Sequence, residues 1–356
     1  MPQGSILGPL LFIVYINDIP NISQIAKFVL YADDANIIIT GDNIHEIESK
    51  LQSLSCSLIE WVNVNELLIN VKKTKYMIFS RSKNKDFPAF NPKLNGIPIE
   101  KKQVVRFLGV LVDDKLTWTN HVTALKAKMS RYIGIMYKLR SIILPAKARA
   151  HIFNSLVQSH LNYCSLIWGS TCKSNIDSLF IIQKKAMRAT MPGHVNYYYK
   201  DGKLPTHTKP GFTSLSVLTV HNVILKNMLS YINSFFNFPG SLPLNVRSCI
   251  PDNVPVPNTP PDEYMIWYTI YNSIPYNKSG FFKAPLLYYH LMTENVHLQC
   301  NLIKTREAYK QRVKVYLLNV QCAGDQEEWC NDNFKLVQAK GLRQSIRILS
   351  QNKNEG

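Results

Sequence analysis

The 356-residue sequence lacks any apolar run of the roughly 18 residues that a membrane-spanning helix needs. It also lacks a C-x-x-C pair, and its seven cysteines follow no regular spacing. Cysteines of this kind are typical of reduced thiols inside cells and argue against a disulfide framework. No positive charge precedes the apolar stretch at residues 6–16, so we interpret it as a buried helix and not as a signal peptide. We expect an intracellular protein, nuclear or cytoplasmic, that is neither secreted nor held in a membrane.

Acidic residues are scarce in the middle of the chain. Residues 115–200 contain one acid, Asp177, against thirteen Lys and Arg residues, whereas residues 1–60 contain seven acids against two bases. The whole chain carries a formal net charge of +17. An acidic segment followed by a basic one favours a metal site beside a surface for phosphate groups. A solvated surface without function is the alternative, although such surfaces usually mix the two signs.

The most informative stretch is Tyr31-Ala32-Asp33-Asp34. Two apolar runs rich in β-branched residues, 25–30 and 35–40, flank the acidic pair, which predicts the turn of a β-hairpin. Two carboxylates held at one turn repel each other, and a bound divalent cation is the usual way to neutralise them. Mg²⁺ suits carboxylate oxygens, and a pair of such ions can clamp the attacking and leaving oxygens of a phosphoryl transfer. Because Asp is common in turns, a purely structural turn is the competing interpretation.

The segments around this turn have recognisable patterns. Residues 2–20 predict a turn that leads into a helix, with Ser5 as N-cap and Pro20 at its end. Apolar residues recur at three- and four-residue steps over 44–62, which predicts a helix that ends near Asn65 and packs on the hairpin. Further strands are expected at 67–70, 76–80 and 104–112, the last interrupted by Gly109.

Beyond Thr117 the periodicity is helical and no internal repeat is present. Charged residues lie largely off the apolar face of the first of these segments. The expected helices cover residues 122–139, 145–169, 176–191, 214–236 and 304–320.

Several motifs in a fixed order resemble reverse transcriptases, most closely those of non-LTR retrotransposons of the jockey and CR1 type. Pro2-Gln3-Gly4-Ser5 resembles the motif that positions template and nucleotide, and Tyr31-Ala32-Asp33-Asp34 the metal-binding hairpin. The segment 106–110 resembles the primer-grip hairpin, and the basic helices after Trp118 resemble the thumb. The next palm motif is matched by Trp61, Leu67, Asn70, Lys73, Thr74, Met77 and Phe79.

The resemblance implies an α+β fold with three parts. Residues 1–114 would form a partial polymerase palm, an antiparallel sheet with packed helices that includes the primer-grip hairpin. Residues 115–191 would form an all-helical thumb. Residues 192–356 would be the mostly helical C-terminal region of the retrotransposon open reading frame.

The activity that the resemblance implies is RNA-directed DNA polymerisation by two-metal nucleotidyl transfer, with an RNA template, a DNA primer, a deoxynucleoside triphosphate and Mg²⁺. Asp33 and Asp34 would be catalytic metal ligands, and Lys73 would stabilise or protonate the leaving pyrophosphate, although a solvated lysine is equally compatible with this turn. Residues implied to contact substrate are Gln3, Gly4, Ser5, Tyr31, Phe107, Leu108 and Gly109. Residues implied to grip the nucleic-acid backbone are Lys126, Lys128, Arg131, Lys138 and Arg140.

In the family, fingers, an endonuclease and a palm strand with a first catalytic aspartate precede these motifs. No residue here can be assigned to that aspartate, so we expect an N-terminally truncated fragment that is inactive alone. The full-length element would supply the missing portion in cis. The alternative hypotheses are a non-catalytic nucleic-acid-binding remnant of a transposable element and a remnant that does not fold stably.

A zinc site in the C-terminal region is a weaker hypothesis. Zinc is held by Cys and His side chains, and structural sites use regular ligand spacings. The spacings in this region match no such pattern. The candidate ligands would be His290, His297, Cys300, Cys322 and Cys330.

Overall fold

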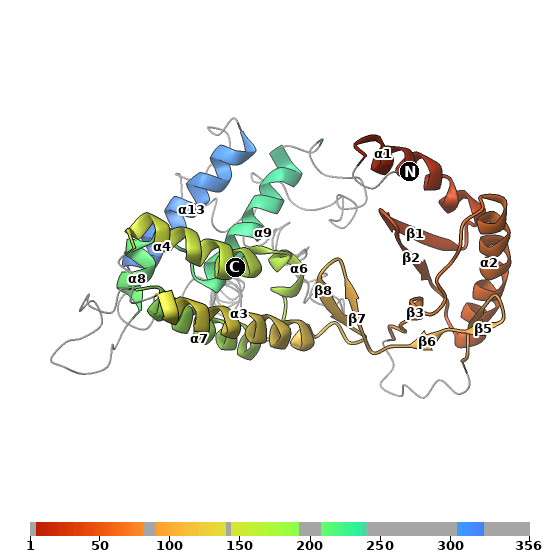
Figure 1. Ribbon diagram of the computed structural model, residues 1–356, viewed down its shortest axis with the longest axis horizontal. Helices are drawn as coiled ribbons and strands as arrows, with labels where there is room; N and C mark the ends of the chain where they lie inside the picture. The colour runs from red at the N-terminus through yellow and green to blue at the C-terminus, as the bar shows by residue number, and fades with distance from the viewer. Residues whose placement is uncertain are drawn as a thin grey trace, which may run out of the picture. The chain divides into compact units, whose positions relative to one another are not determined.

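The computed structural model describes residues 5–80, 90–139, 144–191, 208–237, 240 and 305–323. The chain divides into two compact units, Met1–Leu116 (unit 1) and Thr117–Gly356 (unit 2). Unit 1 mixes helices with short strands, whereas the described part of unit 2 is helical (Figure 1). The fold is therefore a mixture of helices and small sheets, as expected from the sequence.

The described part of unit 1 begins with two helical segments and a hairpin, followed by one long helix and six short strands. These elements are α1 (Leu7–Ile16), the 3₁₀ helix η1 (Ile19–Ile22), β1 (Ala26–Tyr31), β2 (Asp34–Ile39), α2 (Ile44–Val64), β3 (Lys75–Tyr76), β4 (Lys93–Leu94), β5 (Ile97–Pro98), β6 (Glu100–Lys101), β7 (Val104–Phe107) and β8 (Val110–Asp113).

The strands of unit 1 form four two-stranded sheets among the described residues, instead of the one antiparallel sheet that was expected. β1–β2, β4–β5 and β7–β8 are antiparallel pairs, and β3–β6 is a parallel pair. Two of the expected strands differ from prediction. Residues 67–70 form no strand, and the strand expected at 76–80 is reduced to β3. Leu67 and Ile69 pack against the core of unit 1, so burial explains their apolar character without strand pairing.

The core of unit 1 lies between one face of the β1–β2 hairpin and α2. Phe28, Leu30 and Ile37 from that face pack against a cluster that contains Leu58 and Val62 of α2. These hairpin residues share a face because Phe28 pairs with Ile37, Leu30 pairs with Ala35, and side chains alternate along a strand. The hairpin is thus covered by α2 on one side, as the periodicity of α2 predicted (Figure 1).

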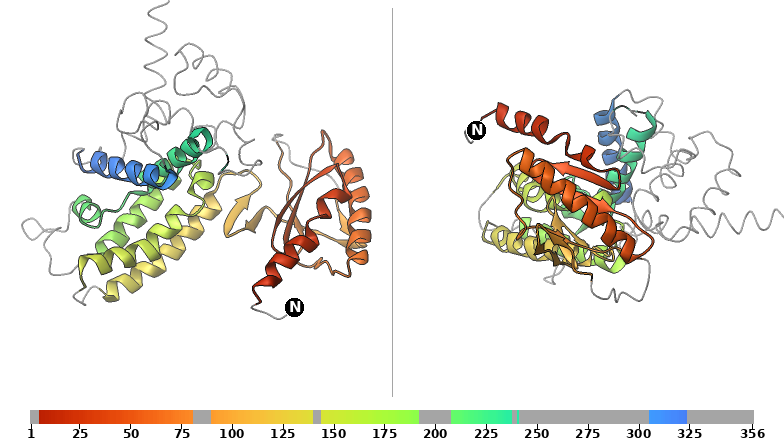
Figure 2. Two further views of the ribbon diagram at one scale, coloured as in Figure 1. Left: turned by 90° about the horizontal axis from the view of Figure 1, so that it is seen from above. Right: turned by 90° about the vertical axis from the view of Figure 1, so that its right-hand side faces the viewer.

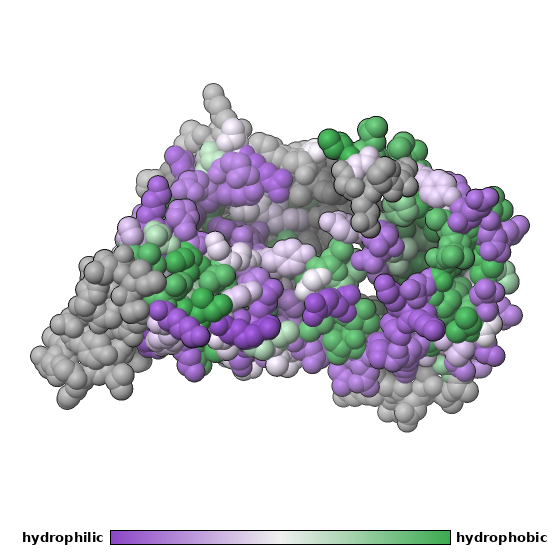
Figure 3. All heavy atoms as spheres, viewed as in Figure 1, coloured by the Kyte–Doolittle hydropathy of each residue, from purple (hydrophilic) through white to green (hydrophobic). Residues whose placement is uncertain are grey.

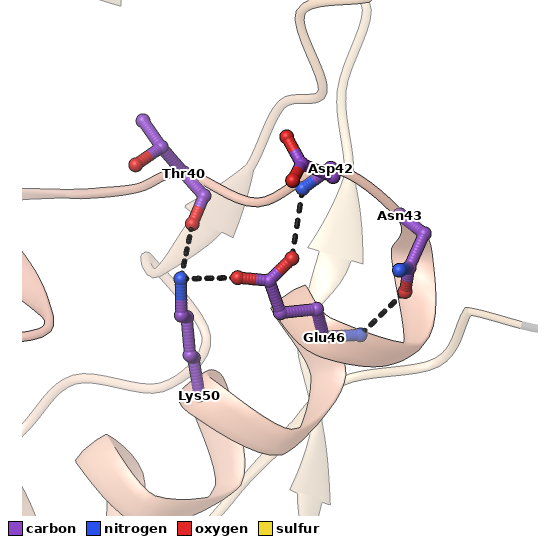
Figure 4. A network of polar contacts seen from close by, with 5 residues as sticks. All are labelled: Thr40, Asp42, Asn43, Glu46 and Lys50. Atoms are coloured by element: carbon purple, nitrogen blue, oxygen red, sulfur yellow. Dashed lines mark hydrogen bonds and ion pairs between the residues drawn. The ribbon is translucent and has the colours of Figure 1, made fainter.

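A polar network joins the end of β2 to the start of α2 (Figure 4). Asn43 is the N-cap of α2, and its Oδ1 accepts a hydrogen bond of 2.9 Å from the backbone N–H of Glu46. The Glu46 carboxylate in turn accepts from the backbone N–H of Asp42, also at 2.9 Å, one residue before the N-cap, in an arrangement similar to a capping box. Lys50 Nζ donates to Glu46 Oε1 at 2.6 Å and to the carbonyl of Thr40 at 2.9 Å. Hydrogen bonding to Lys50, and then to Asp42, lowers the pKa of Glu46.

Helix α1 differs from its prediction in two respects. It has no buried residue, and the N-cap is Ile6, with no side-chain hydrogen bond, instead of Ser5. It ends at Ile16, and Pro20 falls inside η1, where proline is tolerated because the first N–H groups of a helix lack intrahelical partners. Hydrophobic residues gather over α1 on the molecular surface (Figure 3). The prediction of a buried helix is wrong for the described residues, since Phe12 and Ile16 are only half-buried and the Tyr15 hydroxyl, which donates to the Asn65 carbonyl, belongs to an exposed residue.

Unit 2 is built from helices of very different lengths. They are α3 (Thr119–Leu139), α4 (Ala146–Phe153), the π-helical segment η2 (Asn154–Gln158), α5 (Ser159–Asn162), α6 (Ser165–Trp168), α7 (Lys173–Thr190), α8 (Lys209–Ser214), α9 (Val220–Asn237) and α13 (Arg306–Ala323). None of the helices in the described ranges is long and apolar enough to span a membrane.

Two of the expected helices in unit 2 are broken. The helix expected at 145–169 is interrupted by η2 and then by Cys164, whose φ of 51° is left-handed. Trp168 is fully buried next to this break, and its Nε1 donates to the carbonyl of Tyr163 at 2.7 Å. The helix expected at 214–236 is likewise split into α8 and α9. Ser216 lies between them with a φ of 51°.

α3 and α7 run side by side in the same direction (Figures 1 and 2). Near their starts, Asn175 Nδ2 donates to Thr119 Oγ1 at 3.1 Å, and near their ends, Thr190 Oγ1 lies 3.5 Å from Met136 Sδ. Met129 of α3 is fully buried. The apolar faces that predicted these helices therefore form the centre of unit 2.

The start of α9 is held by two buried glutamines from other helices. Gln183 Oε1 of α7 accepts from the N–H of Val220 at 2.8 Å. Gln321 Oε1 of α13 accepts from the N–H of Thr219 at 3.2 Å and from Asn222 Nδ2 at 3.0 Å. These bonds satisfy N–H groups at the helix start that lack intrahelical partners. The Gln183 bond joins helices on the two sides of the expected 191/192 domain boundary, which stays a prediction.

Candidate functional site

The acidic pair lies at the tip of the β1–β2 hairpin. Tyr31 pairs with Asp34, which leaves Ala32 and Asp33 as a two-residue loop. Ala32 has a φ of 49°, in the left-handed region that two-residue hairpin loops require. Asp34 is therefore the first residue of β2, whereas the sequence predicted that both aspartates would lie between the strands. Both side chains are exposed.

One face of the hairpin is open, and Asp34 lies on it. Because Tyr31 and Asp34 are directly opposite each other, they share the face that α2 does not cover. The pairs Val29 with Asn36 and Lys27 with Ile38 continue the same face. Tyr31 is 62% exposed and Ile38 50% exposed, so the described residues leave this face accessible. An exposed aromatic and a carboxylate thus stand side by side next to the Asp33 loop.

The donor set at the tip suits a hard divalent cation. Neither Asp33 nor Asp34 forms an ion pair with another described residue. Carboxylate oxygens are the ligands that Mg²⁺ prefers, and Mg²⁺ is often held by one or two carboxylates together with substrate phosphates. Among the residues that the structure describes, no group of three His, Cys, Asp or Glu side chains could hold a metal ion. The tip therefore offers two carboxylates, not a closed metal site.

Lys73 lies in an exposed turn that Asn70 organises. The backbone N–H of Lys73 donates to the Asn70 carbonyl at 3.0 Å and to Asn70 Oδ1 at 3.2 Å. Thr74 Oγ1 donates to the same carbonyl at 3.0 Å. These bonds explain the Asn70, Lys73 and Thr74 spacing of the motif as a closed turn. No hydrogen bond or ion pair joins Lys73 to Asp33 or Asp34 within the described ranges.

The segment 106–110 forms a second tight hairpin. Phe107 pairs with Val110, and the two-residue loop between them has φ values of 44° at Leu108 and 83° at Gly109. Two consecutive positive φ values match the loop twist that connects antiparallel strands, and glycine adopts it at no steric cost. The continuous strand expected at 104–112 is therefore two strands, β7 and β8, and the interruption at Gly109 is its turn.

Not all predicted site residues can be placed. Gln3, Gly4 and Arg140 lie outside the described residues, as do the side chains of the five candidate zinc ligands. Ser5 is described and half-buried, at the start of the chain segment that leads into α1. The structure brings Tyr31, Asp33 and Asp34 together at one tip. Lys73 and the Phe107–Gly109 loop belong to separate turns.

The basic residues of α3 do not form a single stripe. Arg131 and Lys138 are exposed and seven residues apart, which places them on one side of the helix. Lys126 is half-buried and about 140° around the axis from Arg131, given about 100° per residue. Lys128 lies near His160, whose pKa is lowered by burial and by this lysine. His160 also stacks on Tyr132, with ring centroids 5.5 Å apart.

Sequence reasoning missed the network that fixes the hairpin relative to α2. Asn43, Glu46 and Lys50 bind the chain at Thr40 and Asp42, directly after β2. The signal was present, since Asn43 followed three residues later by Glu46 is the pattern of a capping box. Through this network the long helix α2 anchors the strand that begins with Asp34.

A family model matches the N-terminal part of the chain. Residues 1–112 match the family described as "Reverse transcriptase (RNA-dependent DNA polymerase)". The matched segment contains both hairpins and the Lys73 turn. These residues therefore belong to the reverse transcriptase family.

Comparison with individual relatives indicates which type of reverse transcriptase this segment is similar to. The chain is 28% identical over 196 residues to the probable RNA-directed DNA polymerase from transposon X-element of Drosophila melanogaster, covering 53% of this chain and 21% of that protein. It is 27% identical to the RNA-directed DNA polymerase from mobile element jockey of the same species, again covering 53% and 21%. A Pol polyprotein from the type-1 retrotransposable element R1 of Bradysia coprophila is 24% identical, covering 51% and 18%.

The reverse transcriptase sequence in this chain is thus of the non-LTR retrotransposon type. The aligned part of the chain spans about a fifth of the length of these relatives. No solved structure matches the chain.

Proposed function

We propose that the β1–β2 tip is the metal-binding part of an RNA-directed DNA polymerase active site. The observation that carries the proposal is the pair of exposed carboxylates, Asp33 in the loop and Asp34 on the open face, within the segment that matches the family. The reaction would be template-directed nucleotidyl transfer from a deoxynucleoside triphosphate to the 3′-hydroxyl of a DNA primer on an RNA template.

Each residue of this site has a role that its placement allows. Asp33 and Asp34 would hold Mg²⁺, which when bound would supply Lewis-acid stabilisation of the attacking and leaving oxygens. Tyr31 would form the floor beside the primer end, because it lies exposed opposite Asp34. The exposed ammonium of Lys73 would stabilise or protonate the leaving pyrophosphate. The nucleotide and template would also contact Gln3, Gly4, Ser5 and the Phe107-Leu108-Gly109 turn.

In this proposal the chain has the organisation of a polymerase. Residues 1–114 act as a partial palm, 115–191 as a thumb, and 192–356 as the C-terminal region. The thumb would hold the primer–template duplex through its phosphates, with Lys126, Lys128, Arg131, Lys138 and Arg140. Contacts of this kind carry no sequence information, which suits an enzyme that must move along its template.

We further propose that the 356-residue chain does not extend a primer by itself. A two-metal site needs enough carboxylates to hold both ions, and the described residues bring no third acidic side chain to Asp33 and Asp34. The tip would therefore bind a single divalent ion weakly and fail to orient the substrate.

Two measurements on the purified chain test these proposals. Mn²⁺ binding, followed by water proton relaxation, should weaken at least about 10-fold in Asp33→Asn and Asp34→Asn. The matched control is Asp42→Asn, an exposed aspartate in the loop after β2, which should bind Mn²⁺ as the unmodified chain does. Mg²⁺-dependent primer extension on an RNA template should be absent in all four proteins.

Two results would contradict the account. Equal Mn²⁺ binding by all variants would show that the acidic pair is a structural turn. Primer extension that Asp33→Asn abolishes would show that residues outside the described ranges complete the metal site, and the chain would then be an active polymerase.

A second candidate function is nucleic-acid binding without chemistry. It is favoured by the basic balance of residues 115–200, where thirteen bases face one acid. In that case RNA binding should weaken steeply with salt and should not change in Asp33→Asn. Binding that depends on Mg²⁺ and on Asp33 would instead favour the polymerase site.

A further inference from the structure

A group of lysines lies across α9 and α13, away from the basic residues of α3. Lys226 belongs to α9, and Lys310 and Lys314 belong to α13. The two helices lie side by side in all three views (Figures 1 and 2). All three lysines are half-buried, as is usual for long side chains whose stems pack along a protein surface.

The hydrogen bonds of Gln321 fix the register of the two helices. Gln321, near the end of α13, bonds to Thr219 and Asn222 at the start of α9. Going back seven residues from Gln321 reaches Lys314, and going on four residues from Asn222 reaches Lys226. At about 1.5 Å per residue these displacements are about 10 and 6 Å. Antiparallel helices in this register place Lys314 within about one helical turn of the level of Lys226, with Lys310 about one turn further along.

Neutral polar groups surround Lys226. Its Nζ donates to Asn162 Oδ1 at 3.4 Å. Asn162 Oδ1 also accepts from Asn227 Nδ2 at 2.9 Å, and Asn227 Nδ2 donates to Ser165 Oγ at 2.7 Å. Within the described ranges no carboxylate forms an ion pair with Lys226 or Lys314. Among the described residues, the positive charge of Lys226 is therefore met by an amide oxygen and by no counter-charge.

The charges of this group are mutually unfavourable. Burial lowers the pKa of Lys226, and the positive charges of Lys314 and Lys310 lower it further. One acid stands at the edge of the group, since Glu307 Oε1 lies 2.6 Å from Lys310 Nζ. The Glu307 side chain is 80% exposed, and among the described residues its ion pair is with Lys310 alone. A bound anion would relieve this repulsion, which is the electrostatic condition for an anion site.

We propose that Lys226, Lys310 and Lys314 form a binding site for the phosphodiester backbone of a nucleic-acid strand, the lysine triad. Lys310 and Lys314 are one helical turn apart, so they can contact successive phosphates along a strand. Asn162, Asn227 and Ser165 lie beside Lys226 and supply amide and hydroxyl groups of the type that bind phosphate and sugar oxygens. This site is separate from the α3 residues and does not require Asp33 or Asp34.

The composition of the surface favours a nucleic acid over an anionic lipid surface. Helices that lie on membranes combine basic residues with a broad face of large apolar residues. On the described part of α13 the large apolar side chains Tyr309, Val313 and Leu317 are buried in unit 2, and Val315 alone is an exposed large hydrophobic residue. The surface of α13 that is visible in Figure 3 is largely hydrophilic.

The test is binding of a fluorescent single-stranded RNA of about 20 nucleotides to the full chain, measured by polarisation at several salt concentrations. The variant K226Q/K310Q/K314Q should bind at least about 10-fold more weakly near 0.1 M salt. The slope of log affinity against log salt should become shallower by up to about 2, because up to three phosphate contacts with a single strand are lost.

A matched control removes the same charge elsewhere in unit 2. K147Q/K173Q/K185Q changes three exposed lysines of α4 and α7 and should alter the affinity by less than about 3-fold. The charge-retaining variant K310R/K314R should bind as the unmodified chain does. Circular dichroism and thermal unfolding of each variant show whether the fold is intact.

Three outcomes would overturn the proposal. One is unchanged RNA binding by the triad variant, and another is an equal loss in the matched control, which would reveal only general charge attraction. The third is tight, triad-dependent binding to phosphatidylserine vesicles with no binding of RNA, which would assign the lysines to a lipid surface. Because none of these measurements involves primer extension, failure of the polymerase proposal would leave this test intact.

Discussion

The two units of this protein bury their apolar residues to very different extents. Of the eleven largest side chains that are fully buried in the described residues, ten lie in unit 2 and one, Leu54, lies in unit 1. In unit 1 the whole of α1 is without a buried residue, and one face of the β1–β2 hairpin is open. Unit 2 buries both apolar and polar side chains, including Gln183 and Gln321.

The helices of unit 2 and the β1–β2 hairpin of unit 1 therefore differ in the interactions that fix their positions. In unit 2 the helices are held by tight packing and by hydrogen bonds in the interior, so their positions depend on buried residues. In unit 1 the candidate metal ligands lie on a small hairpin whose position depends on α2 and on surface hydrogen bonds around Glu46. Substitutions should therefore act differently in the two units.

The largest effect is expected from Phe153→Ala in unit 2. Phe153 is fully buried and packs against Phe212, with ring centroids 6.4 Å apart. Its removal should lower the free energy of unfolding by about 3 to 5 kcal/mol. The matched change in unit 1, Leu11→Ala, affects a residue that is 49% exposed and should cost less than about 0.5 kcal/mol. Urea unfolding followed by circular dichroism measures both, and similar losses would show that α1 is covered in solution.

The next largest effect is expected from Gln183→Met. This change leaves the buried N–H of Val220 without its acceptor and Gln158 Oε1 without its donor at 3.1 Å. An unsatisfied buried group costs about 1 to 3 kcal/mol, so a loss of about 2 to 3 kcal/mol is expected in urea unfolding. Gln311→Met, on the exposed side of α13, serves as control. A loss no larger than the control's would mean that the glutamine does not hold the start of α9.

A pH dependence should distinguish the units. Burial lowers the pKa of His121 from 6.5 to about 4, so the unfolded chain binds a proton that the folded chain does not between these values. Stability should therefore fall as the pH is lowered from about 6.5 to 4, by about 2 kcal/mol. The pKa of His221 is lowered too, chiefly by burial, which acts in the same direction. The histidine of unit 1, His45, is exposed.

The pH effect is checked by urea unfolding of unit 2 at a series of pH values. His121→Gln should flatten the dependence between pH 4 and 6.5, whereas His151→Gln, at an exposed site on α4, should leave it unchanged. An unchanged slope in His121→Gln would show that this imidazole is protonated in the folded protein.

The smallest effect is expected from Asn43→Ala, which removes the N-cap of α2. Caps of this type contribute about 1 kcal/mol, and the loss should appear as faster amide hydrogen exchange in the first turn of α2 and the end of β2. The control is Ser53→Ala, at an exposed position within α2. Protection that survives Asn43→Ala would indicate that core packing alone anchors the hairpin.

Local patterns in the sequence predicted the elements that depend on neighbouring residues. The periodicity of 44–62 gave α2, including its end at Asn65, and the flanking apolar runs gave the β1–β2 hairpin around the acidic pair. The carboxylates at its tip were placed correctly near the surface. Such features follow from alternation and helical period, which act over a few residues.

Features that depend on distant residues could not be predicted. The break at Cys164 depends on the burial of Trp168 and its bond to Tyr163, and a sequence pattern does not reveal either. Gln183 and Gln321 carry no signal that they would bind the start of α9. The exposure of α1 was also missed, because an apolar sequence specifies a preference for burial without supplying what covers it.

The bonds of Gln321 to the start of α9 have a consequence for the covalent continuity of the chain. α13 is attached to unit 2 by these bonds and by Tyr309, Val313 and Leu317, all fully buried. A single proteolytic cut anywhere between Asn237 and Arg306 would therefore not release α13. The two pieces would stay together as a nicked protein and separate only in denaturant. α13 would therefore remain an integral part of unit 2 even after the chain that connects it to α9 is cut.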